Sequence, residues 1–270
     1  MSESMDLLPI SPTRPVAPWM GGKRNLAATI IREIEGVPHD LYAEPFIGMG
    51  GVFFRRSFRP KAEVVNDINR DVVTLFRVLQ RHYTPFTEMI RWQLSSRAEF
   101  ERLSSIPPDT LTDLERAARF LYLQRTCFGG KVSGINFGVS PDRPSRFDVG
   151  KIIPMLEDIH DRLTGVTIER LPYAEFIARY DRPATLFYLD PPYWGNETDY
   201  GTGIFNQQDF QVLASLLKEI KGRFLMTLND RKEVRECFAG FRMMALKTTY
   251  TIAEKSAKKV GEVLIRGGGG

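Results

Sequence analysis

The sequence has few of the residues that build disulfide or metal centres. Its two cysteines, Cys127 and Cys237, are too few for a disulfide framework. The three histidines do not stand at metal-ligand spacing from these cysteines, so no metal site is expected. No stretch approaches the ~18 uninterrupted apolar residues of a membrane helix, and the N-terminus lacks the basic segment and apolar core of a signal peptide. These absences predict a cytoplasmic protein that binds neither a membrane nor a metal.

Charge of one sign is not in great excess either. The formal net charge is +4 with a sequence pI near 9.0, which permits a polyanionic partner without requiring one. The chain has 270 residues, of which 43% are hydrophobic. This length and composition predict one large α/β domain that carries an insertion, rather than two equal domains.

The sequence is organised around Asp190-Pro191-Pro192-Tyr193, which follows the apolar run 185–189. Such a run is typical of a central parallel strand, and ligands bind at the carboxyl ends of such strands. The prolines stiffen the loop and lack N–H groups, so the Pro191 carbonyl is available to accept a hydrogen bond. A carboxylate, a carbonyl and an aromatic ring suit a planar substrate with an exocyclic amine, such as adenine or cytosine. A strand-ending turn with a solvated Asp and a packed Tyr is the alternative.

A second pattern predicts the nucleotide-binding corner of a doubly wound sheet. A short strand at 41–43 is followed by the glycine turn 44–51, and a second strand, 62–66, ends at Asp67. An acidic residue about 20 positions beyond such glycines binds a ribose hydroxyl. The full dinucleotide glycine spacing is absent, which favours a nucleoside cofactor over a dinucleotide.

Two further segments are expected to face the same crevice. In the segment 18–23, glycines and Lys23 precede a helical pattern, and a helix N-terminus attracts anions and carboxylates. Tyr173 follows a predicted third strand, 166–169, so its ring could flank an adenine. A hydrophobic staple beside Trp19 and a core position for Tyr173 are the structural alternatives.

The region 85–162 is predicted to be a mostly helical insertion that includes helices at 114–125 and 149–163. Within it, the loop 125–147 mixes glycines and aromatics with basic and small polar side chains, which suits contact with base edges and phosphates. A flexible linker is the alternative. The candidate DNA-binding residues of this loop are Arg125, Lys131, Ser133, Asn136, Arg143 and Arg146. Residues 1–17 and the glycines 267–270 are expected to be flexible ends, and 18–84 with 163–266 to form the catalytic domain.

Three stretches match one family in order, and together they resemble the Dam-like (D12 class, α-group) DNA adenine-N6 methyltransferases. These stretches are 18–23, then 45–50 with 66–69, and then 190–193. The resemblance runs from Trp19 to about Ile265 and implies a Rossmann-like sheet with a helical target-recognition insertion. The segment 227–230 fits a later strand of the family, whereas no site residues are recognisable after Tyr250.

The resemblance implies transfer of the methyl group of S-adenosylmethionine to the N6 amine of an adenine flipped out of DNA. It assigns catalysis to Asp190, Pro191, Pro192 and Tyr193. It assigns the cofactor to Trp19, Gly21, Gly22, Lys23, Glu44, Phe46, Gly48, Gly50, Asp67, Ile68, Tyr173 and Asp190. Asp67 would bind the ribose, and Trp19 and Lys23 the methionine part. The expected partner is double-stranded DNA, bound by a monomer.

Two other functions share these motifs. A cytosine-N4 methyltransferase would use nearly the same site, because cytosine also carries an exocyclic amine. A catalytically silent relative would keep the fold for DNA binding alone, although every motif position is intact here. Restriction–modification and regulatory methylation both fit the motifs.

Overall fold

The computed structural model describes residues 7–130, 134–138, 142, 144–197, 203–246 and 261–269. Within this part, a seven-stranded sheet has the order β5-β4-β2-β6-β7-β9-β8. Its strands in chain order are β2 (Leu41–Glu44), β4 (Ala62–Asn66), β5 (Thr167–Glu169), β6 (Thr185–Leu189), β7 (Arg223–Asn229), β8 (Arg242–Leu246) and β9 (Glu262–Gly268). The strands from β5 to β7 are parallel, and β9 runs antiparallel to both β7 and β8. The predicted doubly wound α/β fold is therefore confirmed.

The order of the strands reverses between β2 and β6. From β2 the chain proceeds outward to β4 and β5, and from β6 it proceeds the other way to β7. All five residues of β6 are buried, as the apolar run predicted for a central strand. Ligands bind at such a switch point, outside the carboxyl ends of the strands.

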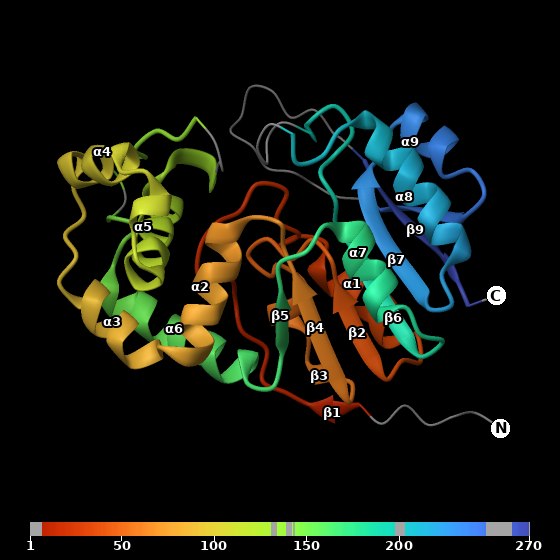
Figure 1. The fold of residues 1–270 in the computed structure, drawn as a ribbon, viewed down its shortest axis with the longest axis horizontal. Coiled ribbons are helices and arrows are strands. Elements are labelled where there is room, and N and C mark those ends of the chain that lie inside the picture. The colour runs from red at the N-terminus through yellow and green to blue at the C-terminus, as the bar shows by residue number, and fades with distance from the viewer. Residues whose placement is uncertain are drawn as a thin grey trace.

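Helices cover both faces of the sheet (Figure 1). On one face, α1 (Ala27–Glu35) and α2 (Arg70–Arg81) share a core with Tyr42, Leu186 and Leu225. On the other face, three helices pack on residues that alternate with these along the strands, such as Ala43 and Phe187. They are α7 (Tyr173–Tyr180), α8 (Gln207–Glu219) and α9 (Lys232–Cys237).

The segment between β4 and β5 is helical, and in Figure 1 its helices α3 to α6 lie beside the sheet with α2 between them and the strands. They are α3 (Tyr83–Arg91), α4 (Arg97–Ser105), α5 (Asp113–Thr126) and α6 (Val149–Leu163), with the short 3₁₀ turn η2 (Pro108–Thr110) before α5. Helix α5 begins with a capping box, in which Thr112 and Glu115 bond to each other's backbone N–H groups.

A buried ion cluster fastens the return helix α6 to the sheet. Glu63 on β4 accepts two hydrogen bonds from Arg162 of α6, at 2.6 and 2.7 Å. It also accepts one from Arg56, at 2.8 Å. Because a buried carboxylate is costly without partners, this cluster fixes where the insertion rejoins the sheet.

The described parts of both chain ends differ from the flexible ends expected from composition, whereas residues 1–6 lie outside the described residues. In the N-terminal segment, β1 (Leu8–Pro9) pairs with β3 (Phe58–Arg59), and Val16 and Ala17 are buried. At the other end, Gly267 and Gly268 belong to β9 and pair with the start of β7. Ladder hydrogen bonds and packing order both segments despite their proline- and glycine-rich composition. Gly270 lies outside the described residues.

Candidate active site

One cavity of about 820 Å³ opens at the carboxyl edge of the parallel strands. Asp67 directly follows β4, Glu44 ends β2 and Asp190 directly follows β6, and all three line it. Eleven of the twelve predicted cofactor residues line this cavity, and Gly50 does not. A volume of this size is sufficient for a nucleoside-containing cofactor and part of a substrate.

Asp190 forms a buried ion pair with Lys23, which the turn before α1 carries. The Lys23 Nζ lies 2.5 Å from the Asp190 Oδ1, and Lys23 is only 2% exposed. The Thr227 hydroxyl donates to the same oxygen at 3.1 Å. Burial raises the pKa of Asp190 to about 6, while Lys23 and the Thr227 hydroxyl act in the opposite direction. At neutral pH the carboxylate is therefore ionised and can accept hydrogen bonds.

The residue that follows the tetrapeptide, Trp194, is bonded to a neighbouring strand. Asn229, the last residue of β7, accepts from the Trp194 backbone N–H and donates to the Trp194 carbonyl, at 3.0 and 2.9 Å. Pro192 lines the cavity. The half-buried Tyr193 lies beside Lys23, whose Nζ is 4.7 Å from its ring centroid. The Asn229 bonds fix the path of the backbone where the loop after β6 leaves the site.

Asp67 closes the glycine turn as well as facing the cavity. Its Oδ2 accepts from the Gly48 backbone N–H at 2.9 Å, and its Oδ1 accepts from Asn69 at 2.8 Å. Burial raises the pKa of Asp67 to about 6, and these two hydrogen bonds oppose the rise. Each carboxylate oxygen has a further lone pair that can accept a hydrogen bond from a ribose hydroxyl.

The glycine turn is packed too closely for larger residues. Gly48 has φ +49, and a Cβ there would lie 2.5 Å from the Trp19 Nε1. At Gly50, with φ +70, a Cβ would lie 2.4 Å from the Phe54 ring. Trp19 therefore packs directly on the turn, which brings the segment 18–23 and the glycine turn into one wall of the cavity.

Aromatic rings form the wall near Asp67. Phe46 and Tyr173 have ring centroids 5.6 Å apart, and Phe205 lies 5.8 Å from Tyr173. The Tyr173 hydroxyl donates to Asp209 at 2.9 Å, which fixes its ring. Such a cluster offers faces and edges against which a planar base can stack.

Glu44 is a second buried carboxyl in the cavity. It accepts a 2.7 Å hydrogen bond from the Tyr42 hydroxyl. Burial raises the pKa of Glu44 to about 8, and the nearby Asp190 charge adds to the rise. Chiefly because of its burial, Glu44 is therefore protonated near pH 7, where Asp190 is ionised.

The predicted DNA-binding residues have different surroundings. Lys131, Ser133 and Arg143 lie outside the described residues. Arg146 is exposed and lines the cavity mouth. Arg125 also lines the cavity, but its guanidinium donates to the Val16 and Arg146 carbonyls. Its side chain therefore has a role inside the protein that the sequence did not indicate.

The described ends of the loop 125–147 pair as a hairpin. The Phe128 N–H donates to the Asn136 carbonyl at 2.9 Å, and the Gly138 N–H donates to the Thr126 carbonyl at 2.8 Å. Cys127 and Phe137 form an antiparallel bridge between them. The described residues of this loop therefore form the base of a hairpin.

Three site residues were not singled out in the sequence. Thr227 contacts Asp190, Phe205 joins the aromatic wall, and Glu262 lies 4.0 Å from the Lys23 Nζ. Thr227 is recognisable as a polar residue within a buried strand. Glu262 is at this edge because β9 is antiparallel and starts where its neighbours end.

No metal or membrane feature accompanies the site in the part of the chain that the structure describes. Among those residues, no group of three or more His, Cys, Asp or Glu side chains could hold a metal ion. None of the described helices is both long enough and apolar enough to cross a bilayer.

Comparison with known proteins gives a consistent result. A family model described as D12 class N6 adenine-specific DNA methyltransferase matches residues 19–252. The type II methyltransferase M.CviBI of Paramecium bursaria Chlorella virus NC1A is 25% identical over an alignment of 256 residues, which covers 93% of this chain and 96% of the viral protein. The DNA adenine methylase of Serratia marcescens is 25% identical over 264 residues, covering 91% of this chain and 95% of its own.

The similarity to solved structures is weaker. The precorrin 8W decarboxylase of Methanobacterium thermoautotrophicum is 13% identical, with a TM-score of 0.40 over 96% of this chain and 100% of that one. That value is too low to add to the fold described above.

Proposed function

Because the chain belongs to the family of D12 class N6 adenine-specific DNA methyltransferases, we propose that Asp190, Pro191, Pro192 and Tyr193 form its catalytic site. The enzyme transfers the methyl group of S-adenosylmethionine to the exocyclic N6 amine of adenine in DNA. The observation that carries the assignment is that Asp190, Asp67 and the aromatic wall line one cavity at the switch point of the sheet.

The cofactor is held by the residues around the glycine turn. Asp67 accepts hydrogen bonds from the ribose hydroxyls, and the rings of Phe46 and Tyr173 flank the adenine. The segment Trp19–Lys23 surrounds the methionine part together with Gly48, Glu44 and Ile68, while Gly50, which does not line the cavity, shapes the turn next to Gly48. This arrangement is supported by the shared cavity and by the absence of room for a Cβ at Gly48.

Asp190 and the Pro191 carbonyl act on the target amine. Adenine N6 is conjugated with its ring and is a weak nucleophile, so its lone pair must be drawn out of conjugation. Two acceptors aimed at its N–H bonds favour a more tetrahedral nitrogen and hold it in line for attack. S-adenosylmethionine supplies the methyl group on a positively charged sulfur, and a sulfur–carbon bond is exchanged for a carbon–N6 bond.

The methylated amine must then lose one proton. Asp190 is the ionised carboxylate beside it at neutral pH, so it can accept this proton and release it to water. The rate enhancement comes from positioning of the amine and from electrostatic stabilisation, and no covalent intermediate with the protein is needed.

The substrate is a base in double-stranded DNA, flipped out of the stack at a short recognition sequence. An amine inside a stacked duplex cannot reach Asp190, and Tyr193 recovers part of the lost stacking energy. The residues 85–162 form the target-recognition insertion, in which the hairpin within 125–147 reads the DNA through Lys131, Ser133, Asn136, Arg143 and Arg146. We propose further that the enzyme acts as a monomer in the cytoplasm.

Product analysis tests this function. DNA free of modified bases is incubated with the protein and labelled S-adenosylmethionine, digested to nucleosides and separated by mass. Labelled N6-methyladenine is expected, and modification sequencing of the same DNA gives the recognition sequence. Label in N4-methylcytosine would replace the adenine assignment, whereas DNA binding without label would identify a silent relative.

A further inference from the structure

Three hydrogen bonds connect Gln124 of α5, Gly130 of the hairpin within 125–147, and the cofactor segment 18–23, which carries the cofactor residues Trp19–Lys23. The Gln124 Nε2, on the last turn of α5, donates to the carbonyls of Pro18 and Gly130 at 2.9 and 2.8 Å. The Met20 N–H donates to the same Gly130 carbonyl at 3.1 Å. Gln124 is only 3% exposed, and its hydrogen bond to the Gly130 carbonyl is buried.

Gly130 packs directly against the backbone of the cofactor segment. It has φ +67, and a Cβ there would lie 3.0 Å from the Pro18 carbonyl carbon and 3.1 Å from the Trp19 nitrogen. Its neighbour Gly129 has φ +77, but a Cβ there would meet nothing within 4 Å. Both positions favour glycine for their backbone conformation, and only Gly130 also needs it for a close approach.

The cofactor segment also contacts the glycine turn and the catalytic carboxylate. Trp19 packs on the glycine turn at Gly48, and Lys23 forms the ion pair with Asp190. A shift of Gly130 therefore displaces backbone that is directly connected to both the cofactor wall and the catalytic carboxylate.

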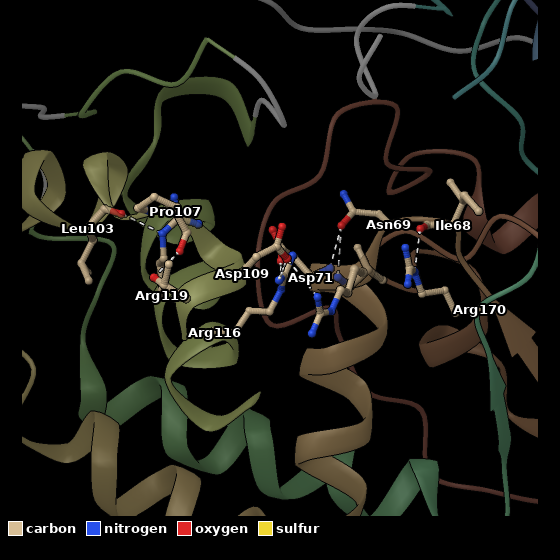
Figure 2. Close-up of polar contacts among 12 residues, drawn as sticks. Ile68, Asn69, Asp71, Leu103, Pro107, Asp109, Arg116, Arg119 and Arg170 are labelled. Carbon is tan, nitrogen blue, oxygen red and sulfur yellow. Dashed lines mark hydrogen bonds and ion pairs between the residues drawn. The ribbon is translucent and has the colours of Figure 1, made fainter. Parts of the chain in front are cut away.

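Helix α5 cannot absorb such a shift, because its other end is also fixed. Arg116 donates to Asp71 at 2.5 Å and to Asp109 at 2.7 Å, as Figure 2 shows. Asp71 lies in the first turn of α2, whose cap Asn69 follows the cofactor residues Asp67 and Ile68. Thus α5 is bonded at its N-terminal end to the helix that follows the cofactor residues, and at its C-terminal end to the segment 18–23.

We propose that Gln124 and Gly130 are positioning residues that couple DNA binding by the hairpin to cofactor binding, so that each ligand strengthens the binding of the other. The proposal rests on the proposed DNA-reading role of the hairpin. By thermodynamic linkage, the factor by which DNA raises cofactor affinity equals the factor by which the cofactor raises DNA affinity.

The test measures that factor. Calorimetry gives the affinity for S-adenosylhomocysteine, which cannot donate a methyl group. It is measured with and without a short duplex that carries the recognition sequence found in the product analysis. Fluorescence anisotropy of the labelled duplex gives the reciprocal value. In the unmodified protein a coupling of roughly 5- to 150-fold is expected.

Two variants disrupt the contact of Gln124 and Gly130 with the cofactor segment 18–23, and each has a matched control. Gly130→Ala pushes a methyl group into Pro18 and Trp19, whereas Gly129→Ala adds the same backbone strain without a clash. Gln124→Met removes two hydrogen bonds to carbonyls. Gln80→Met does the same elsewhere, since the Gln80 Nε2 donates to the carbonyls of Leu163 and Val166, both at 2.9 Å.

The coupling factor should fall towards one in Gly130→Ala and Gln124→Met and stay unchanged in the two controls. This difference is expected even if a variant and its control lower the thermal midpoint of unfolding by the same amount. If Gly130→Ala or Gln124→Met does not fold, the other decides. An unchanged coupling factor in Gly130→Ala and Gln124→Met would overturn the coupling inference but not the proposed function. The same holds if the unmodified protein methylates DNA but shows no coupling. An unmodified protein that neither binds nor methylates DNA overturns the proposed function instead.

Discussion

The ammonium group of Lys23 lies 2.5 Å from the Asp190 Oδ1 and 4.7 Å from the centroid of the Tyr193 ring. One buried cation thus contacts both side chains that are proposed to act on the target base. Its charge opposes the effect of burial on the pKa of Asp190.

The pair makes the reaction dependent on pH. The pKa of Asp190 is raised to about 6, chiefly by burial, so the ionised acceptor is lost as the pH falls through that value. We expect kcat/KM to rise with pH through about 6 and then to level off. Removing the cation in Lys23→Met should raise the pKa further and move the acid limb to higher pH, whereas Lys23→Arg should move it little. A limb that stays in place in Lys23→Met would contradict this role of Lys23.

A change at Asp67 should weaken cofactor binding. In Asp67→Ala, the ribose loses its charged acceptor and the Gly48 N–H loses its partner. A charged hydrogen bond contributes roughly 1.5–3 kcal/mol, so calorimetry should show an affinity about ten- to a hundredfold lower. Asp67→Asn keeps an acceptor oxygen and should lose less. Unchanged affinity in Asp67→Ala would remove the ribose assignment.

The two basic residues at the start of the hairpin should give different phenotypes. Arg125 donates to the Val16 and Arg146 carbonyls, so Arg125→Met should lower the thermal midpoint. Lys131→Ala should leave the midpoint and the cofactor affinity intact, but reduce DNA binding. If Lys131 contacts a phosphate, the slope of log K against log salt should become shallower by about one. Equal salt slopes for Lys131→Ala and the unmodified protein would show that Lys131 contacts no phosphate.

The sequence predicted the central site because its residues follow parallel strands of one sheet. Asp67 and Asp190 come together for that reason alone. Glu262 could not be placed in the same way, since its position depends on β9 entering the sheet antiparallel between β7 and β8. Gln124 resembles any polar residue at a helix end, and its two carbonyl partners lie in segments that only the fold brings together. The C-terminal glycines appeared flexible by composition, but pairing with β7 places two of them in a strand.

Tyr193 should affect base extrusion rather than the chemistry itself. Stacking on an aromatic ring contributes about 1–3 kcal/mol per base, so Tyr193→Ala should lower the population of the extruded base. The fluorescence of 2-aminopurine at the target position reports this population. Tyr193→Phe keeps the ring and should retain the signal. A normal fluorescence change in Tyr193→Ala would exclude the stacking role.

The most direct test of the account is single-turnover methyl transfer by Asp190→Ala and by Asp190→Asn, which preserves the shape of the side chain. Both variants are first shown to bind S-adenosylhomocysteine and the duplex, and to give the 2-aminopurine signal. With binding intact, the account predicts transfer at least ~10²-fold slower than in the unmodified protein, the scale of losing one preorganised electrostatic partner. Near-normal transfer by Asp190→Ala would contradict the proposal that this carboxylate prepares the adenine amine for attack.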